Sequence, residues 1–378
     1  MTIDPNLRVS DFDYDLPQEL IAQTPLPDRD RARLLVLDRA SGAIDHSWVY
    51  ELPRWLRPGD LLVANNSRVI PARLHARKTQ TGGQVEILLL QAREEGIWTA
   101  LARPARRLHP GTLLRLIPRN PTAPAAALEI IARREDGLVE VRFLDRADLR
   151  LEEYGETPLP PYIHQELHDA ERYQTVYARV PGSAAAPTAG LHITERLRQQ
   201  LEEQGVGWAE VTLHIGLDTF RPVSVERVAD HKMHTEWCQV SDDTARQIAS
   251  AKASGGRIVA IGTTSARTLE TLGTAVEPGA TTRLYRSHRH LYNAWLPVAT
   301  GGCAVDELPP AAVHAAHDGE RLRREGSHPR RLSRGHCAAL PLLFLRRRHA
   351  HRVGLSGRGE IGVPRFCRAE SDRRGGWA

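Results

Sequence analysis

The chain has 378 residues, 41% hydrophobic and 26% charged, and is long enough for two domains with sizeable cores. It contains no run of eighteen apolar residues, so the sequence predicts no membrane-spanning helix. The net charge of +5 is uneven, because residues 288–378 alone carry +8 and the remainder carries −3. The overall charge therefore does not by itself indicate a nucleic-acid-binding protein.

Two further global features limit the location and chemistry of the protein. The first residues lack a basic-then-apolar signal pattern, and we expect a cytoplasmic protein. The cysteines form no Cys-x-x-Cys pair, so neither a disulfide framework nor a zinc site is indicated; they are Cys238, Cys303, Cys337 and Cys367.

A buried strand is predicted at residues 61–63, and it ends in the polar run Asn65, Asn66, Ser67 and Arg68. Such a run commonly forms an ordinary turn. An arginine in this position can also bind a carboxylate or a phosphate through two parallel hydrogen bonds. Arg68 is therefore a candidate substrate-binding residue.

Short strand-like runs recur from residue 76 onward, at residues 85–90, 98–102, 112–117, 128–131 and 138–143. Glycine and proline turns separate them, which is typical of a small antiparallel β-barrel. One loop of this region is basic and could contact RNA phosphates or simply be solvated; it contains Pro104, Arg106, Arg107 and His109.

The most informative stretch covers residues 184–222. A loop of small residues, ending in Thr188, Ala189 and Gly190, precedes a predicted helix whose apolar positions include Leu191, Leu197 and Leu201. Small residues let a ligand approach the backbone, and a helix amino terminus attracts anions. A half-buried strand then follows at residues 211–215. The two polar loops carry the candidates His192, His214, Thr219 and Arg221, although a strand, a helix and two ordinary loops would explain the pattern too.

Two later segments add candidates. His231, His234 and Glu236 have a spacing that resembles a metal site, but Lys232 lies between them and acid–base or substrate-binding roles are favoured. A buried strand at residues 257–261 ends in a turn that opens a helix, where hydroxyls could hold a polar ligand or merely cap the helix. The candidates of this turn are Thr263, Thr264, Ser265 and Arg267.

The segments APTAGLH, ERYQTVYA, VTLHIGLDTFRPV and HKMHTE resemble the S-adenosylmethionine:tRNA ribosyltransferase-isomerase family of queuosine biosynthesis. The resemblance covers residues 8–285. It implies a mixed α/β main domain formed by residues 1–75 and 157–287, interrupted by a small antiparallel β-barrel at residues 76–156. The family motifs would place Thr188, Ala189 and Gly190 at the substrate.

The resemblance also implies a reaction. The ribosyl part of S-adenosylmethionine moves to the aminomethyl nitrogen of a 7-deazaguanine at the tRNA wobble position and is isomerised, giving epoxyqueuosine-tRNA, adenine and methionine. The implied partners are tRNA and S-adenosylmethionine as co-substrate, with no metal, no prosthetic group, no membrane and a monomeric protein. The implied catalytic residues are His192, His214, His231, His234 and Glu236. The implied substrate-binding residues are Arg68, Thr188, Ala189, Gly190, Thr219, Arg221, Thr263, Thr264, Ser265 and Arg267.

The sequence departs from the family pattern at two places. Asn66 and Ser67 replace the usual Asp-Thr, and Gly216-Leu217-Asp218 replaces Gly-Ala-Gly, which adds a carboxylate where the family has no side chain. Two alternatives therefore remain: a non-catalytic RNA-binding protein, and an inactive product of a damaged gene.

The amino-acid sequence after Ser287 lacks the segments that the family has there. Reading one nucleotide later, with the codons that each residue allows, restores them in order: residues 288–299 can give TDIYITPGYRW, residues 306–317 TNFHLPQSTLLM, and residues 336–351 IARRYRFFSYGDAML. We interpret residues 288–378 as out of frame after about Ser287. The sequence predicts that this arginine-rich tail is largely disordered.

Overall fold

The structure is a computed structural model that describes residues 8–14, 16–38, 41–216, 225–230, 236–275, 303–307 and 341–345. Within these ranges, none of the helices has the length and apolar character that crossing a membrane requires.

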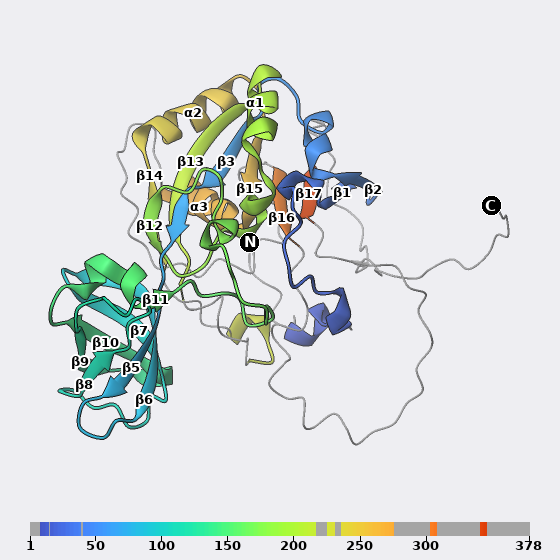
Figure 1. The fold of residues 1–378 in the computed structure, drawn as a ribbon. Coiled ribbons are helices and arrows are strands. Elements are labelled where there is room, and N and C mark those ends of the chain that lie inside the picture. The colour runs from blue at the N-terminus through green and yellow to red at the C-terminus, as the bar shows by residue number, and fades with distance from the viewer. Residues whose placement is uncertain are drawn as a thin grey trace, which may run out of the picture. The chain divides into compact units, whose positions relative to one another are not determined.

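An eight-stranded mixed sheet forms the first part of the fold (Figure 1). Its strand order is β14-β13-β3-β15-β16-β17-β1-β2, and the four strands β13, β3, β15 and β16 are mutually parallel neighbours. The bounds are β1 Arg33–Asp38, β2 Ile44–Trp48, β3 Leu61–Asn65, β13 Gly207–His214, β14 Trp237–Val240, β15 Ile258–Ile261, β16 Cys303–Glu307 and β17 Pro341–Leu345.

Helices cover both faces of this sheet, which explains why β3 is buried along its whole length. Alternate residues of β3 point to opposite faces, so Leu62 packs in one core with Leu197 of α1. Leu61 packs in a second core with Ile248 of α2 and Leu269 of α3. The bounds are α1 Glu195–Glu203, α2 Asp242–Ala253 and α3 Gly262–Ala275.

Side-chain caps fix where α1 and α2 begin. Thr194 Oγ1 accepts a hydrogen bond from the amide of Leu197 at 3.1 Å, and Ser241 Oγ accepts one from Thr244 at 3.1 Å. The predicted helix therefore starts later than its apolar pattern indicated. Leu191 precedes α1 and lies in the 3-10 segment Thr188–His192, where it packs against Val69, Tyr173 and Ala186.

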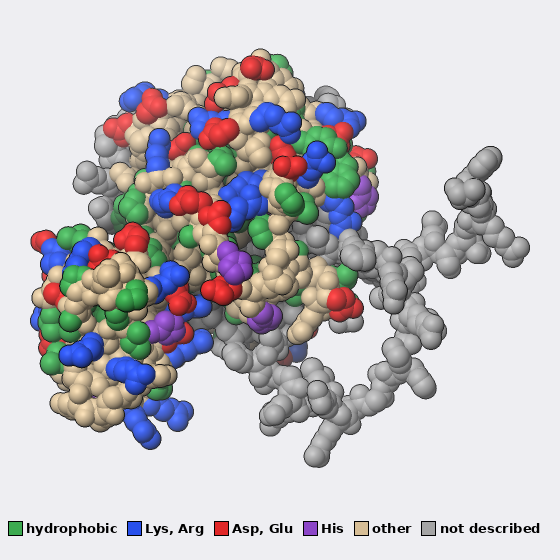
Figure 2. All heavy atoms as spheres, in the orientation of Figure 1, with side chains coloured by type: hydrophobic (Ala, Val, Ile, Leu, Met, Phe, Trp, Pro, Cys, Tyr) green, Lys and Arg blue, Asp and Glu red, His purple; other side chains and the backbone are tan. Residues whose placement is uncertain are grey.

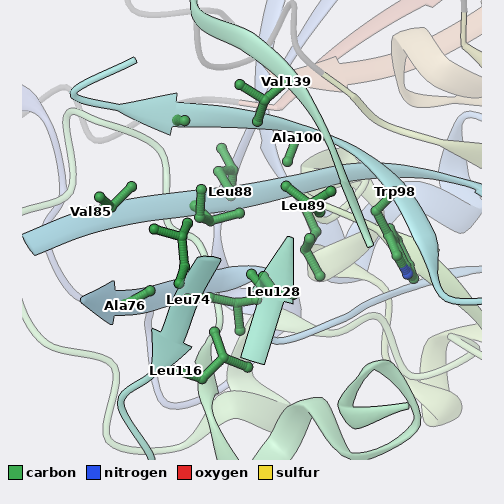
Figure 3. Packing of buried hydrophobic residues seen from close by; sticks show 14 of the residues in the cluster. Leu74, Ala76, Val85, Leu88, Leu89, Trp98, Ala100, Leu116, Leu128 and Val139 are labelled. Atoms are coloured by element: carbon green, nitrogen blue, oxygen red, sulfur yellow. The ribbon is translucent and has the colours of Figure 1, made fainter. Parts of the chain in front are cut away.

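A second sheet closes on itself as an antiparallel barrel (Figure 3). The ring runs β5-β6-β7-β10-β9-β8 and is closed by pairing of β8 with β5, while β11 pairs with the first two residues of β5. Buried side chains such as Leu74, Leu89 and Leu128 fill its interior. The bounds are β5 Arg73–Lys78, β6 Gln84–Glu94, β7 Ile97–Arg103, β8 Leu113–Leu116, β9 Ala127–Arg133, β10 Leu138–Phe143 and β11 Gly155–Glu156. This barrel beside an α/β sheet confirms the fold class predicted from the sequence.

A small parallel pair joins two chain segments that carry family motifs. It consists of β4 Ser67–Val69 and β12 Val180–Ser183. Of residues 288–378, the structure describes only β16 and β17, both as strands of the eight-stranded sheet. The prediction of a largely disordered tail concerns residues that otherwise lie outside the described part of the chain.

Candidate active site

The carboxyl ends of β3, β13 and β15 lie at one edge of the sheet, because these three neighbouring strands are parallel. In open α/β sheets this edge is the usual place for ligands. The strands end at Asn65, His214 and Ile261, and β14 begins at the same edge because Trp237 pairs with His214. Residues predicted from distant parts of the sequence therefore meet there.

His214 lies at the end of β13, half-buried, with its ring 4.7 Å from that of Trp237. Burial lowers the pKa of His214 to about 4, while a hydrogen bond to the backbone of Val180 acts in the opposite direction. Its Nε2 atom is buried and has no hydrogen-bond partner among the described residues, which assigns the Val180 bond to Nδ1. The imidazole is thus neutral near pH 7 and presents a free acceptor nitrogen.

Gly182 makes room for this ring. A Cβ atom at Gly182 would lie 2.4 Å from Cε1 and 2.7 Å from Nδ1 of His214, and its φ of +136° is a conformation that side chains rarely adopt. Gly182 was not among the predicted site residues. The only signal in the sequence was the Pro181-Gly182 pair inside a strand-like segment.

Glu236 and Arg267 form a buried ion pair at the same edge, with side chains 6% and 14% exposed. The Oε1 atom of Glu236 also accepts a hydrogen bond from the amide of Gly216 at 2.9 Å. The pair therefore connects the residue before β14, the end of β13 and the first turns of α3. Because both charges are largely desolvated, their attraction is strong and the loss of either partner is costly.

The small-residue loop packs against the turn that opens α3. Gly262 has a φ of +82°, and a Cβ atom there would lie 3.4 Å from that of Ala189. Two hydroxyls of the turn, Thr264 Oγ1 and Ser265 Oγ, are buried without a hydrogen-bond partner among the described residues, whereas Thr263 is exposed. Buried polar groups are almost always paired in folded proteins, so these hydroxyls fit a ligand's polar groups.

A third buried hydroxyl, that of Tyr177, lies beside this loop. The Tyr177 hydroxyl is close to Gly190, where an added Cβ would lie only 2.1 Å from it. It has no hydrogen-bond partner within the described ranges, and burial raises the pKa of Tyr177. Tyr177 belongs to the motif ERYQTVYA, which resembles the family but for which no role was predicted.

Two predicted residues lie at the margin of this arrangement. Arg68, on β4, forms an ion pair with Glu171 and is 37% exposed. His192 ends the Thr188–His192 segment and is half-buried. Four predicted residues lie outside the described residues: Thr219, Arg221, His231 and His234.

The departure at Asn66 has a local explanation. Asn66 Nδ2 donates to Glu210 Oε2 at 3.0 Å, and its Oδ1 accepts from Thr212 Oγ1 at 2.7 Å. An aspartate at this position could not donate to Glu210, so asparagine suits this neighbour. Ser67 is fully buried.

The described part of the chain offers no group of three histidine, cysteine, aspartate or glutamate side chains that could hold a metal ion. One cavity of the described part of the chain is lined by residues that include Pro27, Arg29 and Arg196, and another, in the barrel, by residues that include His75, Arg103 and Glu156. Neither contains a predicted site residue.

The structure is an α/β protein with a closed β-barrel, and at one edge of its larger sheet a half-buried histidine, His214, lies near a buried ion pair of Glu236 and Arg267. The family model described as "Queuosine biosynthesis protein" matches residues 9–290. An S-adenosylmethionine:tRNA ribosyltransferase-isomerase of Thermotoga maritima is 51% identical over 266 residues, 70% of this chain and 77% of the relative. The same enzyme of Thermotoga petrophila is 50% identical over the same shares.

A crystal structure of the S-adenosylmethionine tRNA ribosyltransferase from Thermotoga maritima is similar with a TM-score of 0.40 and 31% identity, covering 89% of this chain and 100% of that chain. The family match and the sequence identities show that the chain belongs to the queuosine biosynthesis family of S-adenosylmethionine:tRNA ribosyltransferase-isomerases, which confirms the resemblance seen in the sequence.

Proposed function

We propose that this chain transfers the ribosyl moiety of S-adenosylmethionine to the aminomethyl nitrogen of a 7-deazaguanine in tRNA and isomerises it, giving epoxyqueuosine-tRNA, adenine and methionine. The observation that carries the proposal is the family match, because residues 9–290 include every candidate site residue. S-adenosylmethionine is then a co-substrate, and its sulfonium activates the ribose carbon without a metal or prosthetic group. We propose a monomeric, cytoplasmic enzyme.

Both the new bond to nitrogen and the isomerisation of the ribose require proton transfers, so the site needs a base. We assign this role to His214. Its neutral state and its unpaired Nε2 support the assignment, because the imidazole can accept a proton near pH 7. A pKa near 4 makes it a weak base in the free protein, and a cationic co-substrate would lower that pKa further. A short-lived imidazolium therefore returns its proton readily.

The other residues have positioning and binding roles in this proposal. Glu236 and Arg267 fix the end of β13 and thereby the position of His214. The segment Thr188–His192 and the hydroxyls of Thr264 and Ser265 hold the ribose hydroxyls of the co-substrate. Further binding and proton-transfer roles, with the wobble base taken out of its stack, belong to Arg68, His192, Thr219, Arg221, Thr263, His231 and His234.

The test measures the transfer of a label from the ribose of S-adenosylmethionine to tRNA, not the binding of either substrate. S-adenosylmethionine labelled in its ribose carbons is incubated with this chain and with tRNA that carries the 7-aminomethyl-7-deazaguanine. We expect label to become covalently attached to that tRNA and not to the same tRNA with guanine at the wobble position. His214→Asn keeps a donor for Val180 but removes Nε2, and we expect the transfer rate to fall by about 10²–10⁴-fold.

His164→Asn is the matched control, because His164 is exposed and its change leaves the proposed site intact. Its transfer rate should equal that of the unaltered chain. If the folded chain binds tRNA and transfers no label, the proposed reaction of this chain is wrong, and either a non-catalytic RNA-binding protein or an inactive product of a damaged gene is indicated.

A further inference from the structure

A cavity of about 360 Å³ lies outside the site described above and is dominated by arginine. Its walls come from the 3-10 segments Arg29–Arg31 and Ala170–Tyr173 and from the start of α1. The charged side chains that line it are Asp28, Arg29, Asp30, Arg31, Arg172 and Arg196. Four guanidinium groups therefore face two carboxylates in one concave space.

Each carboxylate already has its own arginine. Arg31 Nε lies 2.9 Å from Asp28, and Arg196 Nη2 lies 3.1 Å from the buried carboxylate of Asp30, which also accepts from Thr194. These two pairs are internally neutral. The excess positive charge of the cavity therefore belongs to Arg29 and Arg172.

Arg29 and Arg172 are held by backbone carbonyls instead of carboxylates. Arg29 donates to Leu191 O at 3.2 Å and to Glu171 O at 2.9 Å, and Arg172 donates to Pro27 O at 3.3 Å and to Leu26 O. Among the described residues, neither arginine forms an ion pair within 4.0 Å. Their positions are thus fixed while their charges stay uncompensated at close range.

The two guanidinium groups are also electrostatically coupled. Burial and then the charge of Arg172 lower the pKa of Arg29, while Asp169 and Glu171 act in the opposite direction. Two like charges held near one another favour an anion between them. On the face of the molecule shown in Figure 2, basic and acidic side chains are interspersed, so no broad positive patch covers that face.

We propose that this arginine-lined cavity binds a phosphodiester group of the tRNA backbone. Fixed guanidinium forks match phosphate oxygens geometrically, and phosphate contacts of this kind orient a nucleic acid without reading its sequence. Arg29 also bonds to Leu191, so the cavity adjoins the segment Thr188–His192 of the candidate active site. The inference rests on the proposed tRNA substrate and adds the place where its backbone is held.

The test is the salt dependence of tRNA binding, measured by fluorescence anisotropy with the full chain and no turnover. Each phosphate contact contributes close to one unit to the slope of log affinity against log salt concentration, so Arg29→Gln and Arg172→Gln should each reduce that slope by about 1. Arg172→Lys keeps the charge and should keep the slope. Arg246→Gln removes an exposed charge from α2 and is the control, with an unchanged slope.

Folding is checked by circular dichroism, because Arg172 also holds Leu26 and Pro27. If Arg172→Gln does not fold, the salt-dependence slope of Arg29→Gln alone tests the proposal. Unchanged slopes in folded variants overturn the cavity proposal alone. A chain that is folded but shows no salt-dependent tRNA binding overturns the proposed tRNA substrate as well.

Titrations with two further ligands test whether the cavity binds a small anion instead of the tRNA backbone. The same variants are titrated with S-adenosylmethionine, whose carboxylate is also an anion, and with inorganic phosphate. We expect S-adenosylmethionine affinity to be unchanged in Arg172→Gln, because Arg172 bonds to Leu26 and Pro27 and not to the segment Thr188–His192. Weaker binding of S-adenosylmethionine or of inorganic phosphate, with an unchanged tRNA slope, would assign the cavity to a small anion and overturn the proposal.

Discussion

At the scale of single residues, the chemistry of His214 depends on neighbours from other parts of the chain. Gly182 leaves space for its ring, Val180 binds one ring nitrogen, and Trp237 covers one side. The place of His214 at the end of a predicted strand and the family motif VTLHIGLDTFRPV made it a candidate. Its neutral state could not be predicted, because burial and the contact with Gly182 arise only when β12 meets the end of β13.

The lowered pKa of His214 makes a prediction about stability. Between pH 6.5 and about pH 4 the unfolded chain binds a proton at this histidine that the folded chain does not bind. The free energy of unfolding should therefore fall as the pH falls through this window, by up to about 3 kcal/mol from this residue. Urea unfolding of the chain and of His214→Asn, measured across the window, should give a flatter pH dependence for the variant.

The exposed His164 serves again as the control, and His164→Asn should follow the unaltered chain. Parallel pH profiles for all three proteins would show that His214 titrates normally and would remove the basis for its neutral state.

At the scale of elements, a buried ion pair joins two elements at the active edge. Glu236 precedes β14, and Arg267 lies in the second turn of α3. Both residues were predicted to be in the site, from the HKMHTE motif and from the helix that follows the Gly262 turn. Their mutual pairing could not be read from the sequence, because it depends on the strand order β14-β13-β3-β15.

A double-mutant cycle tests this link. Glu236→Gln keeps an acceptor for the Gly216 amide but removes the carboxylate that pairs with Arg267, and Arg267→Gln removes the guanidinium that pairs with Glu236. Each single change should lower the free energy of unfolding by about 3–5 kcal/mol, because the remaining buried charge loses this partner. The double change should cost less than the sum, since it removes both charges.

The exposed pair of Asp243 and Arg246 on α2 gives the matched control cycle, with a coupling of about 0.5 kcal/mol or less. If the changes in the free energy of unfolding are additive in both cycles, the Glu236 and Arg267 side chains are not coupled, which would contradict the role given to this pair.

Boundaries of elements were less predictable than their existence. The helix after the small-residue loop was predicted, yet Leu191 lies outside it because Thr194 caps α1. Five of the six ring strands were predicted from short apolar runs and turn residues, whereas β5, Arg73–Lys78, was not. Strand order in the larger sheet could not be predicted, because it depends on pairings between distant segments.

At the scale of the whole molecule, the family match ends at residue 290, close to Ser287, where the reading frame was interpreted as shifted. The described site residues precede this point. Beyond it, β16 and β17 pair with β15 and β1, so residues after Ser287 contribute two strands to the sheet that carries the site. We propose that a one-nucleotide shift replaced the family's usual carboxyl-terminal segments.

The most direct measurement of the central claim is adenine release from S-adenosylmethionine in the presence of tRNA carrying the deazaguanine precursor. This chain is compared with a version corrected by one nucleotide at Ser287. The account predicts release by both proteins that requires the precursor base, and a rate at least about ten-fold higher for the corrected chain because its sheet regains the family's own segments. A corrected chain that folds, binds tRNA and releases no adenine would contradict the account.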